Sequence, residues 1–157
     1  MFPGWLFTLL VLLPNALMLL RPPQQVPGNL KTDKKLEALE RAGQAGCFIL
    51  PIFYQASLSA PWWQAAGLGL AAAALLFYYA GWLRYLLQGQ AFRLLFAPMC
   101  RVPIPLAVAP VIYFFAAGLF LAAWPLALAA LLLAAGHLGV SWQTARQVKE
   151  WEETHEN

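Results

Sequence analysis

Eight polar side chains lie inside or at the ends of long apolar stretches, and their types suit hydrogen bonding to a ligand. They are Asn15, Gln44, Tyr54, Tyr78, Arg84, Tyr85, His137 and Ser141. Polar groups are costly inside a membrane span, so residues of this kind are candidate functional sites. Amide, imidazole, hydroxyl and guanidinium groups offer donors and acceptors to a polar head, and the tyrosine rings suit an apolar chain. We therefore predict an amphiphilic, lipid-like ligand.

Helical spacing places several of these residues on common faces. The first face, with i, i+3, i+7 and i+10 spacing, contains Gln44, Cys47, Pro51 and Tyr54. The second contains Tyr78, Gly81, Trp82 and Tyr85, and the third contains His137 and Ser141 at i, i+4 spacing. With a rise of about 1.5 Å per residue, Asn15, Gln44 and His137 come out at a similar depth. These residues are expected to form one polar layer.

A purely structural interpretation of the same residues stays open. Each polar group then makes a single interhelical hydrogen bond, worth about 0.6 kcal/mol. Arg84 extends to the lipid headgroups and the tyrosines anchor the helices at the interface. Three prolines within apolar stretches, Pro14, Pro51 and Pro110, each free a backbone carbonyl. The resulting kinks either let short helices pack or open a cavity.

Motifs for other chemistry are missing from the sequence. It contains no HExxH, CxxC, GxxxxGK[ST] or GxSxG motif. We predict no metal site, no cofactor and no nucleic-acid partner, and the catalytic residues, if any, are unknown. Cys47 and Cys100 are expected at the cytosolic side, where a disulfide is disfavoured.

Charge distribution predicts the elements that carry these side chains. All ten Lys and Arg and all seven Asp and Glu lie in three patches, at 21–41, 84–101 and 146–156. Hydrophobic residues make up 61% of the chain and charged residues 11%, against about 25% charged in soluble domains. Between the patches, residues 1–20 suffice for one membrane crossing, and residues 42–83 and 102–145 each suffice for two.

The pattern predicts an all-α integral membrane protein, a bundle of five transmembrane helices. The spans are about 2–20, 38–58, 62–87, 103–122 and 125–145, in a single transmembrane domain of residues 1–157. All three charged patches then lie on one side, which the positive-inside rule makes cytoplasmic. The N-terminus is outside and the C-terminus cytoplasmic, with cytosolic loops at 21–37 and 88–102 and a cytosolic tail at 146–157. We expect a multi-pass protein of the bacterial cytoplasmic, or inner, membrane.

Local signals support the helix ends. Asp33 can cap the second helix, and Glu37 and Arg41 have the favourable i, i+4 spacing. Tryptophan favours the headgroup level of a membrane. Four tryptophans fall at the predicted outer boundary and two at the inner one: Trp5, Trp62, Trp63 and Trp124; Trp82 and Trp142. The turns at 57–61 and 123–125 are short and contain proline.

Three short segments have a limited resemblance to the membrane-associated glutathione transferase and eicosanoid family (MAPEG). They are Glu40-Arg41, Arg84-Tyr85 and Ala97-Pro98. The resemblance implies a small trimeric helical enzyme that uses glutathione on lipophilic substrates, with Arg84 and Tyr85 stabilising an anion or thiolate. The sequence departs from that family at 45–48, where Ala-Gly-Cys-Phe replaces its Asn and Glu, and in its fifth span. No family is assigned on this basis.

Two function classes therefore remain. The first is a non-catalytic membrane protein that binds a lipid-like ligand in the cytosolic half of the bundle, or that is a subunit of a membrane assembly. Its partners would be membrane lipids and either a second copy of the chain or another membrane protein. The second class is a membrane-embedded enzyme on a lipophilic substrate. The sequence favours the first class, and whether the protein is an enzyme stays undecided.

Overall fold

The computed structural model describes residues 1–56 and 61–155, which are mostly helical and form an all-α fold. The helices are α1 (Trp5–Asn15), α2 (Leu17–Leu20), α3 (Lys34–Ile49), α4 (Trp62–Leu87), α5 (Pro105–Phe120), α6 (Trp124–Leu133) and α7 (Gly139–His155). Two 3₁₀ turns (Leu50–Phe53 and Phe92–Leu95), a π-helical turn (Ala134–Leu138) and the two-residue strands β1 (Phe2–Pro3) and β2 (Gln55–Ala56) complete the elements.

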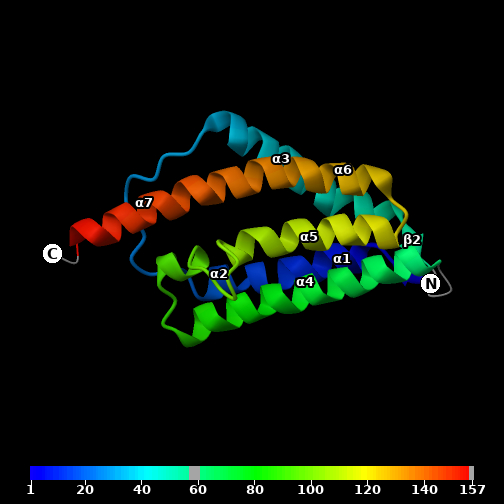
Figure 1. The fold of residues 1–157 in the computed structure, drawn as a ribbon, viewed down its shortest axis with the longest axis horizontal. Helices are drawn as coiled ribbons and strands as arrows, with labels where there is room; N and C mark the ends of the chain where they lie inside the picture. The colour runs from blue at the N-terminus through cyan, green and yellow to red at the C-terminus, as the bar shows by residue number, and fades with distance from the viewer. Residues whose placement is uncertain (57–60, 156–157) are drawn as a thin grey trace.

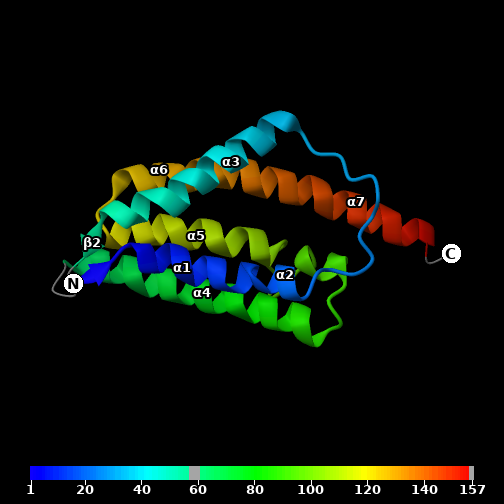
Figure 2. The same ribbon diagram turned by 180° about the vertical axis from the view of Figure 1, so that it is seen from behind.

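The helices form two layers along the long axis of the molecule (Figure 1). One layer contains α1, α2, α4 and α5, and the other contains α3 and the rod made by α6, the π turn and α7 (Figures 1 and 2). The start of α1 and the end of α7 lie at opposite ends of the fold (Figure 1). β1 and β2 pair antiparallel at the N-terminal end.

The start of α3 forms as its sequence predicts. The Asp33 side chain caps the helix by accepting a hydrogen bond from the Lys35 backbone nitrogen at 2.7 Å. Glu37 and Arg41 form an exposed ion pair at 3.7 Å. The helix starts before the predicted residue 38, directly after its cap at Asp33. It ends before the predicted residue 58, because Pro51 cannot donate to a continuing α-helix and a 3₁₀ turn takes over. Residues 57–60 of the predicted outer turn lie outside the described residues.

The final rod is longer than predicted. α6 begins with Pro125 in its first turn and continues through the π turn into α7, which ends at His155. Most of the predicted 146–157 tail is therefore helical, with residues 156–157 outside the described part. The predicted span 103–122 corresponds to α5, which contains Pro110.

Close backbone contacts join α3 to this rod. A Cβ atom on Gly43 would lie 2.3 Å from the Leu133 backbone nitrogen, and one on Gly136 would lie 2.1 Å from the Glu40 backbone nitrogen. Glycine is therefore required at both positions of the crossing. This close approach of backbones occurs within one chain.

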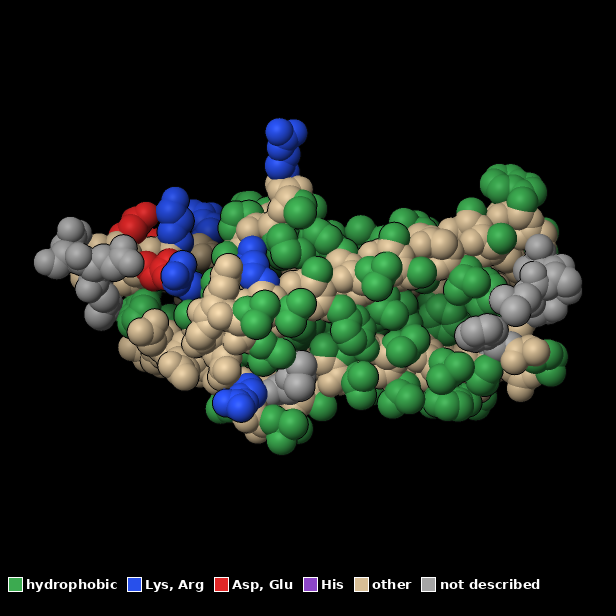
Figure 3. Space-filling view, turned by 90° about the horizontal axis from the view of Figure 1, so that it is seen from below, with side chains coloured by type: hydrophobic (Ala, Val, Ile, Leu, Met, Phe, Trp, Pro, Cys, Tyr) green, Lys and Arg blue, Asp and Glu red, His purple; other side chains and the backbone are tan. Residues whose placement is uncertain are grey.

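Two helices are long and apolar enough to cross a membrane, judged by length and composition: Trp62–Leu87 and Trp124–Thr154. The helices at Trp5–Leu20 and Pro105–Phe120 are also apolar but shorter. Hydrophobic side chains cover most of the face drawn in Figure 3, and the charged ones on that face gather toward the C-terminal end. Leu13, Leu76 and Leu128 are examples of exposed leucines on three different helices.

Pro14 leaves a backbone carbonyl of α1 without a donor, and a side chain of α4 supplies one. Proline has no backbone N–H, so Pro14 leaves the carbonyl of Leu10, four residues earlier, without its helical donor. The Tyr79 hydroxyl donates to that carbonyl oxygen at 2.8 Å. The proline thus ties α1 to α4 through a side chain, and α1 ends one residue later at Asn15.

We expect Tyr79→Phe to lower the free energy of unfolding by about 1–3 kcal/mol, because the Leu10 carbonyl loses its donor. In a Pro14→Ala background the helix supplies its own N–H, and the cost should fall below about half of that value. Chemical unfolding of the purified protein, followed by circular dichroism, measures both. If Tyr79→Phe lowers the free energy of unfolding equally with and without Pro14, Tyr79 does not replace the donor that the proline removes.

Candidate functional site

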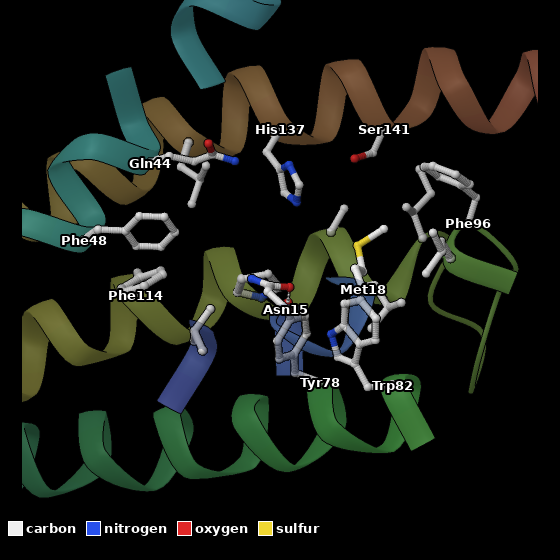
Figure 4. A pocket seen from close by; sticks show the side chains of 17 residues that line it. Asn15, Met18, Gln44, Phe48, Tyr78, Trp82, Phe96, Phe114, His137 and Ser141 are labelled. Atoms are coloured by element: carbon white, nitrogen blue, oxygen red, sulfur yellow. Dashed lines mark hydrogen bonds between the residues drawn. The ribbon is translucent and has the colours of Figure 1, made fainter. Parts of the chain in front are cut away.

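A cavity of about 240 Å³ lies between the two layers. We call it the interlayer cavity. It is lined by Val11, Asn15, Met18, Gln44, Phe48, Tyr78, Trp82, Leu95, Phe96, Ile104, Leu106, Ala107, Pro110, Phe114, Leu133, His137 and Ser141. Most of these side chains are apolar, and a few polar groups converge among them (Figure 4). Such a composition is typical of small-molecule sites, although the volume is below the usual lower limit of about 300 Å³.

Five of the eight predicted ligand-binding residues meet at this cavity. They are Asn15, Gln44, Tyr78, His137 and Ser141. They come from α1, α3, α4, the π turn and α7, which are far apart in the sequence. These five residues therefore line one cavity.

Asn15 and Tyr78 form the polar pair on the α1 and α4 side. The Tyr78 hydroxyl donates to Asn15 Oδ1 at 2.6 Å. Asn15 is the last residue of α1, where the chain changes direction after Pro14, and Tyr78 is only 4% exposed. The hydrogen bond leaves the Asn15 amide NH₂ as a donor on this side of the cavity.

His137 occupies the opposite side and is held by a carboxylate. Its Nδ1 lies 2.6 Å from Glu40 Oε1, and both side chains are largely buried. Gln44 Nε2, one turn along α3, lies 3.5 Å from the same oxygen. The ring points into the cavity in Figure 4. His137 belongs to the π turn, and single π turns within α-helices are frequent at functional sites.

Glu40 was not among the predicted site residues, because the charged patch that contains it was interpreted mainly as a solvated helix start and an orientation signal. A usable clue was present, since Glu40 precedes Gln44 by four residues and so shares its helical face. The long helix start that Asp33 caps brings this carboxylate beside the π turn. The sequence thus indicates that Glu40 and Gln44 share a helical face, whereas the contact between Glu40 and His137 is visible only in the structure.

Trp82, which the sequence predicts at the inner membrane boundary, is buried inside the protein. Its side chain is 4% exposed and lines the interlayer cavity. Its ring packs edge-to-face on Tyr78 and Tyr85, at centroid distances of 6.2 and 5.6 Å. The indole Nε1 is buried and has no partner in hydrogen-bonding geometry among residues 1–56 and 61–155. An unmet buried donor costs free energy and is a feature to explain.

Ser141 is buried and lies one turn beyond His137 on the same rod. Figure 4 shows its hydroxyl on the cavity side, near the imidazole. His137 and Ser141 thus face the same cavity, although the π turn contains the first of them.

Arg84 does not line the interlayer cavity. Its guanidinium donates to three backbone carbonyl oxygens, those of Leu94 at 3.0 Å, Ala97 at 2.8 Å and Pro98 at 2.8 Å. These bonds fasten the segment after α4 to the end of that helix. The side chain therefore stabilises the loop and is turned away from the polar cluster.

Tyr85 and Tyr54 also lie elsewhere. The Tyr85 hydroxyl donates to the Arg21 carbonyl at 3.0 Å, which ties α4 to the loop after α2. Tyr54 follows the 3₁₀ turn in extended backbone, and its carbonyl accepts from Gly4 near the N-terminus. The i+10 position predicted for Tyr54 fails because the α-helix has already ended.

A second hollow of about 450 Å³ adjoins the first, and we call it the basic groove. It runs between α7 and the segment before α5, and shares Phe96 and Ile104 with the interlayer cavity. Its charged lining residues are Arg93, Arg146, Lys149 and Glu152. Arg93 and Glu152 form an ion pair at 3.3 Å.

Comparison with known proteins gave no match to a protein-family model, a curated protein or a solved structure. The geometry of the site is therefore the basis for any functional assignment.

We expect Glu40→Ala to destabilise the protein by about 1.5–3 kcal/mol, because it leaves His137 Nδ1 buried without its charged partner. Arg41→Ala on the same helix is the matched control. It breaks an exposed ion pair and should cost no more than about 1 kcal/mol. Thermal and chemical unfolding of the two variants measure the difference, and similar losses would contradict the importance of the imidazole–carboxylate contact.

Proposed function

We propose that this chain is a five-span membrane protein that binds an amphiphilic, lipid-like ligand in the interlayer cavity, without catalysis. The observation that carries the proposal is the convergence of Asn15, Gln44, Tyr78 and His137 on one mostly apolar cavity. Polar groups placed at membrane depth are expensive, and their grouping around a cavity favours a binding role over four separate interhelical contacts.

Membrane insertion is supported by surface and charge together. Exposed apolar side chains cover the molecule along most of its length, and large apolar surfaces of this kind signal contact with lipid or protein (Figure 3). The loops at 21–33 and 88–104, together with the end of α7, lie at one end of the fold (Figure 1). That end carries the basic residues, so we place it in the cytosol.

The ligand would enter with its polar head toward His137 and Asn15 and its apolar part along the aromatic lining. Phe48 and Phe114 pack together at 5.8 Å and face this space (Figure 4). Because the cavity is small, it encloses a small molecule or only one portion of a larger lipid. No observation favours the transferase alternative, since Arg84 and Tyr85 are engaged with backbone carbonyls outside the cavity.

Cys100 provides a native probe of the proposed topology. It is exposed in the loop before α5, whereas Cys47 is buried. In intact cells that express the protein, a membrane-impermeant maleimide should label Cys100 only after permeabilisation. A Cys100→Ser, Gln55→Cys variant moves the thiol to the opposite end and should react before permeabilisation. Labelling with the reverse pattern would overturn the orientation.

Ligand binding can be tested by filling the cavity. Ala107 lines it and is 3% exposed, so Ala107→Leu adds bulk inside, whereas Ala72→Leu adds the same bulk to an exposed position of α4. We expect Ala107→Leu to reduce the lipid retained after purification by roughly tenfold, which corresponds to about 1.4 kcal/mol of binding free energy. Mass spectrometry of extracted lipids measures this. Equal retention by both variants and the parent would refute the binding proposal.

A further inference from the structure

We infer that the interlayer cavity takes an uncharged head group that both donates and accepts hydrogen bonds, with the hydroxyl of an aliphatic alcohol as its simplest form. This inference rests on the proposed function and adds the chemical class of the ligand. It follows from the polar groups on the two sides of the cavity, which are His137 with Glu40 on one side and Trp82 with Asn15 on the other.

The His137 ring turns Nδ1 toward Glu40 and Nε2 toward the cavity (Figure 4). Because a carboxylate only accepts hydrogen bonds, Nδ1 must carry the proton in its contact with Glu40. In the neutral ring Nε2 is then an acceptor, and in the protonated ring it is a donor. A hydroxyl group can satisfy Nε2 in either state. Glu40 is thus a positioning residue that fixes the orientation of the ring.

The opposite side offers donors. The buried indole N–H of Trp82 can only donate. It lies beside the Tyr78 hydroxyl, but it has no acceptor in good hydrogen-bonding geometry within the described part of the chain. Asn15 uses its Oδ1 to accept from Tyr78, so its amide nitrogen remains as a second donor. The ligand must therefore accept hydrogen bonds here. An alkylammonium head, whether primary or quaternary, has no acceptor and would leave the Trp82 donor unmet.

An anionic head is disfavoured by charge. Lys and Arg are absent from the cavity lining that the structure describes, and the Glu40–His137 pair has a net charge of −1 or 0. A sulfate or phosphate group would bring further negative charge into a largely apolar site without a counter-charge. The cations Arg93, Arg146 and Lys149 line the basic groove instead. An uncharged head group therefore suits the interlayer cavity, and an anionic one suits the basic groove.

Three ten-carbon probes with the same chain and different heads test the inference: 1-decanol, decyl sulfate and decyltrimethylammonium. They are added at equal detergent mole fraction to the purified full chain. We expect 1-decanol alone to raise Tm, saturably, by roughly 3–6 °C at tenfold saturation. The other two should give only the non-saturable effect of added surfactant.

Conservative tryptophan variants link the effect to the cavity. Trp82→Phe keeps an aromatic ring at this position but removes the indole N–H, so the shift with 1-decanol should fall by at least half while the ligand-free protein stays folded. Trp124→Phe, at an exposed position outside the cavity, should retain the full shift. An unchanged shift in Trp82→Phe would overturn the assigned role of that donor.

Glu40→Gln tests the charge argument. Removing the carboxylate should raise the affinity for decyl sulfate relative to 1-decanol by roughly tenfold, because the repulsion of an anionic head is lost. Glu37→Gln removes the same charge from α3 away from the cavity and should leave the ratio unchanged. A merely structural role for Glu40 would not change this ratio.

Failure of the inference and failure of the proposed function give different results. If decyl sulfate or decyltrimethylammonium gives the saturable, Trp82-dependent shift, the cavity binds an amphiphile but the head-group class is wrong. If no probe shifts Tm while Ala107→Leu still loses its retained lipid, the inference is also wrong and the binding proposal stands. If the lipid is retained equally in Ala107→Leu and no probe acts, both are refuted.

Discussion

The structure depends on the contact between the α3 backbone and the π turn of the final rod. Gly43 and Gly136 have no side chains to hold the two segments apart, so the main chain of one lies against the main chain of the other. Glu40 can then reach His137, and Gln44 lies next to the same carboxylate. The imidazole faces the other layer as a result. A polar cluster and the interlayer cavity both follow from this one approach of backbones.

In the opposite layer, a proline of α1 and two tyrosines of α4 fix the position of the end of α1. Pro14 ends the regular hydrogen bonding of α1 and leaves the Leu10 carbonyl free, and Tyr79 of α4 supplies the missing donor. The adjacent Tyr78 bonds Asn15, the last residue of α1. Consecutive tyrosines thus hold the broken helix end at the cavity. In a membrane, where no water can satisfy such groups, these bonds are also the means by which a proline is tolerated.

The unequal accuracy of the sequence-based predictions has physical causes. The cap at Asp33 and the shared face of Tyr78, Trp82 and Tyr85 depend on local helix geometry, and both are present. Arg84 was misplaced because its guanidinium found three carbonyl oxygens in a loop whose path has no periodic pattern. Tyr54 was misplaced because helix periodicity was extended past Pro51. Glu40 was missed because its partner is 97 residues away.

The sequence by itself determined the all-α architecture, the approximate limits of the helices and the separation of charged from apolar segments. These properties depend on composition and on contacts within a few residues, so they can be recognised without a fold. Only the tertiary structure decided which polar groups meet: Glu40 lies against His137, and Tyr78 bonds Asn15. It also decided that the Trp82 indole N–H has no acceptor in hydrogen-bonding geometry within residues 1–56 and 61–155. Side-chain direction around each helix and the crossing of α3 over the rod control those encounters, and neither is encoded in local spacing.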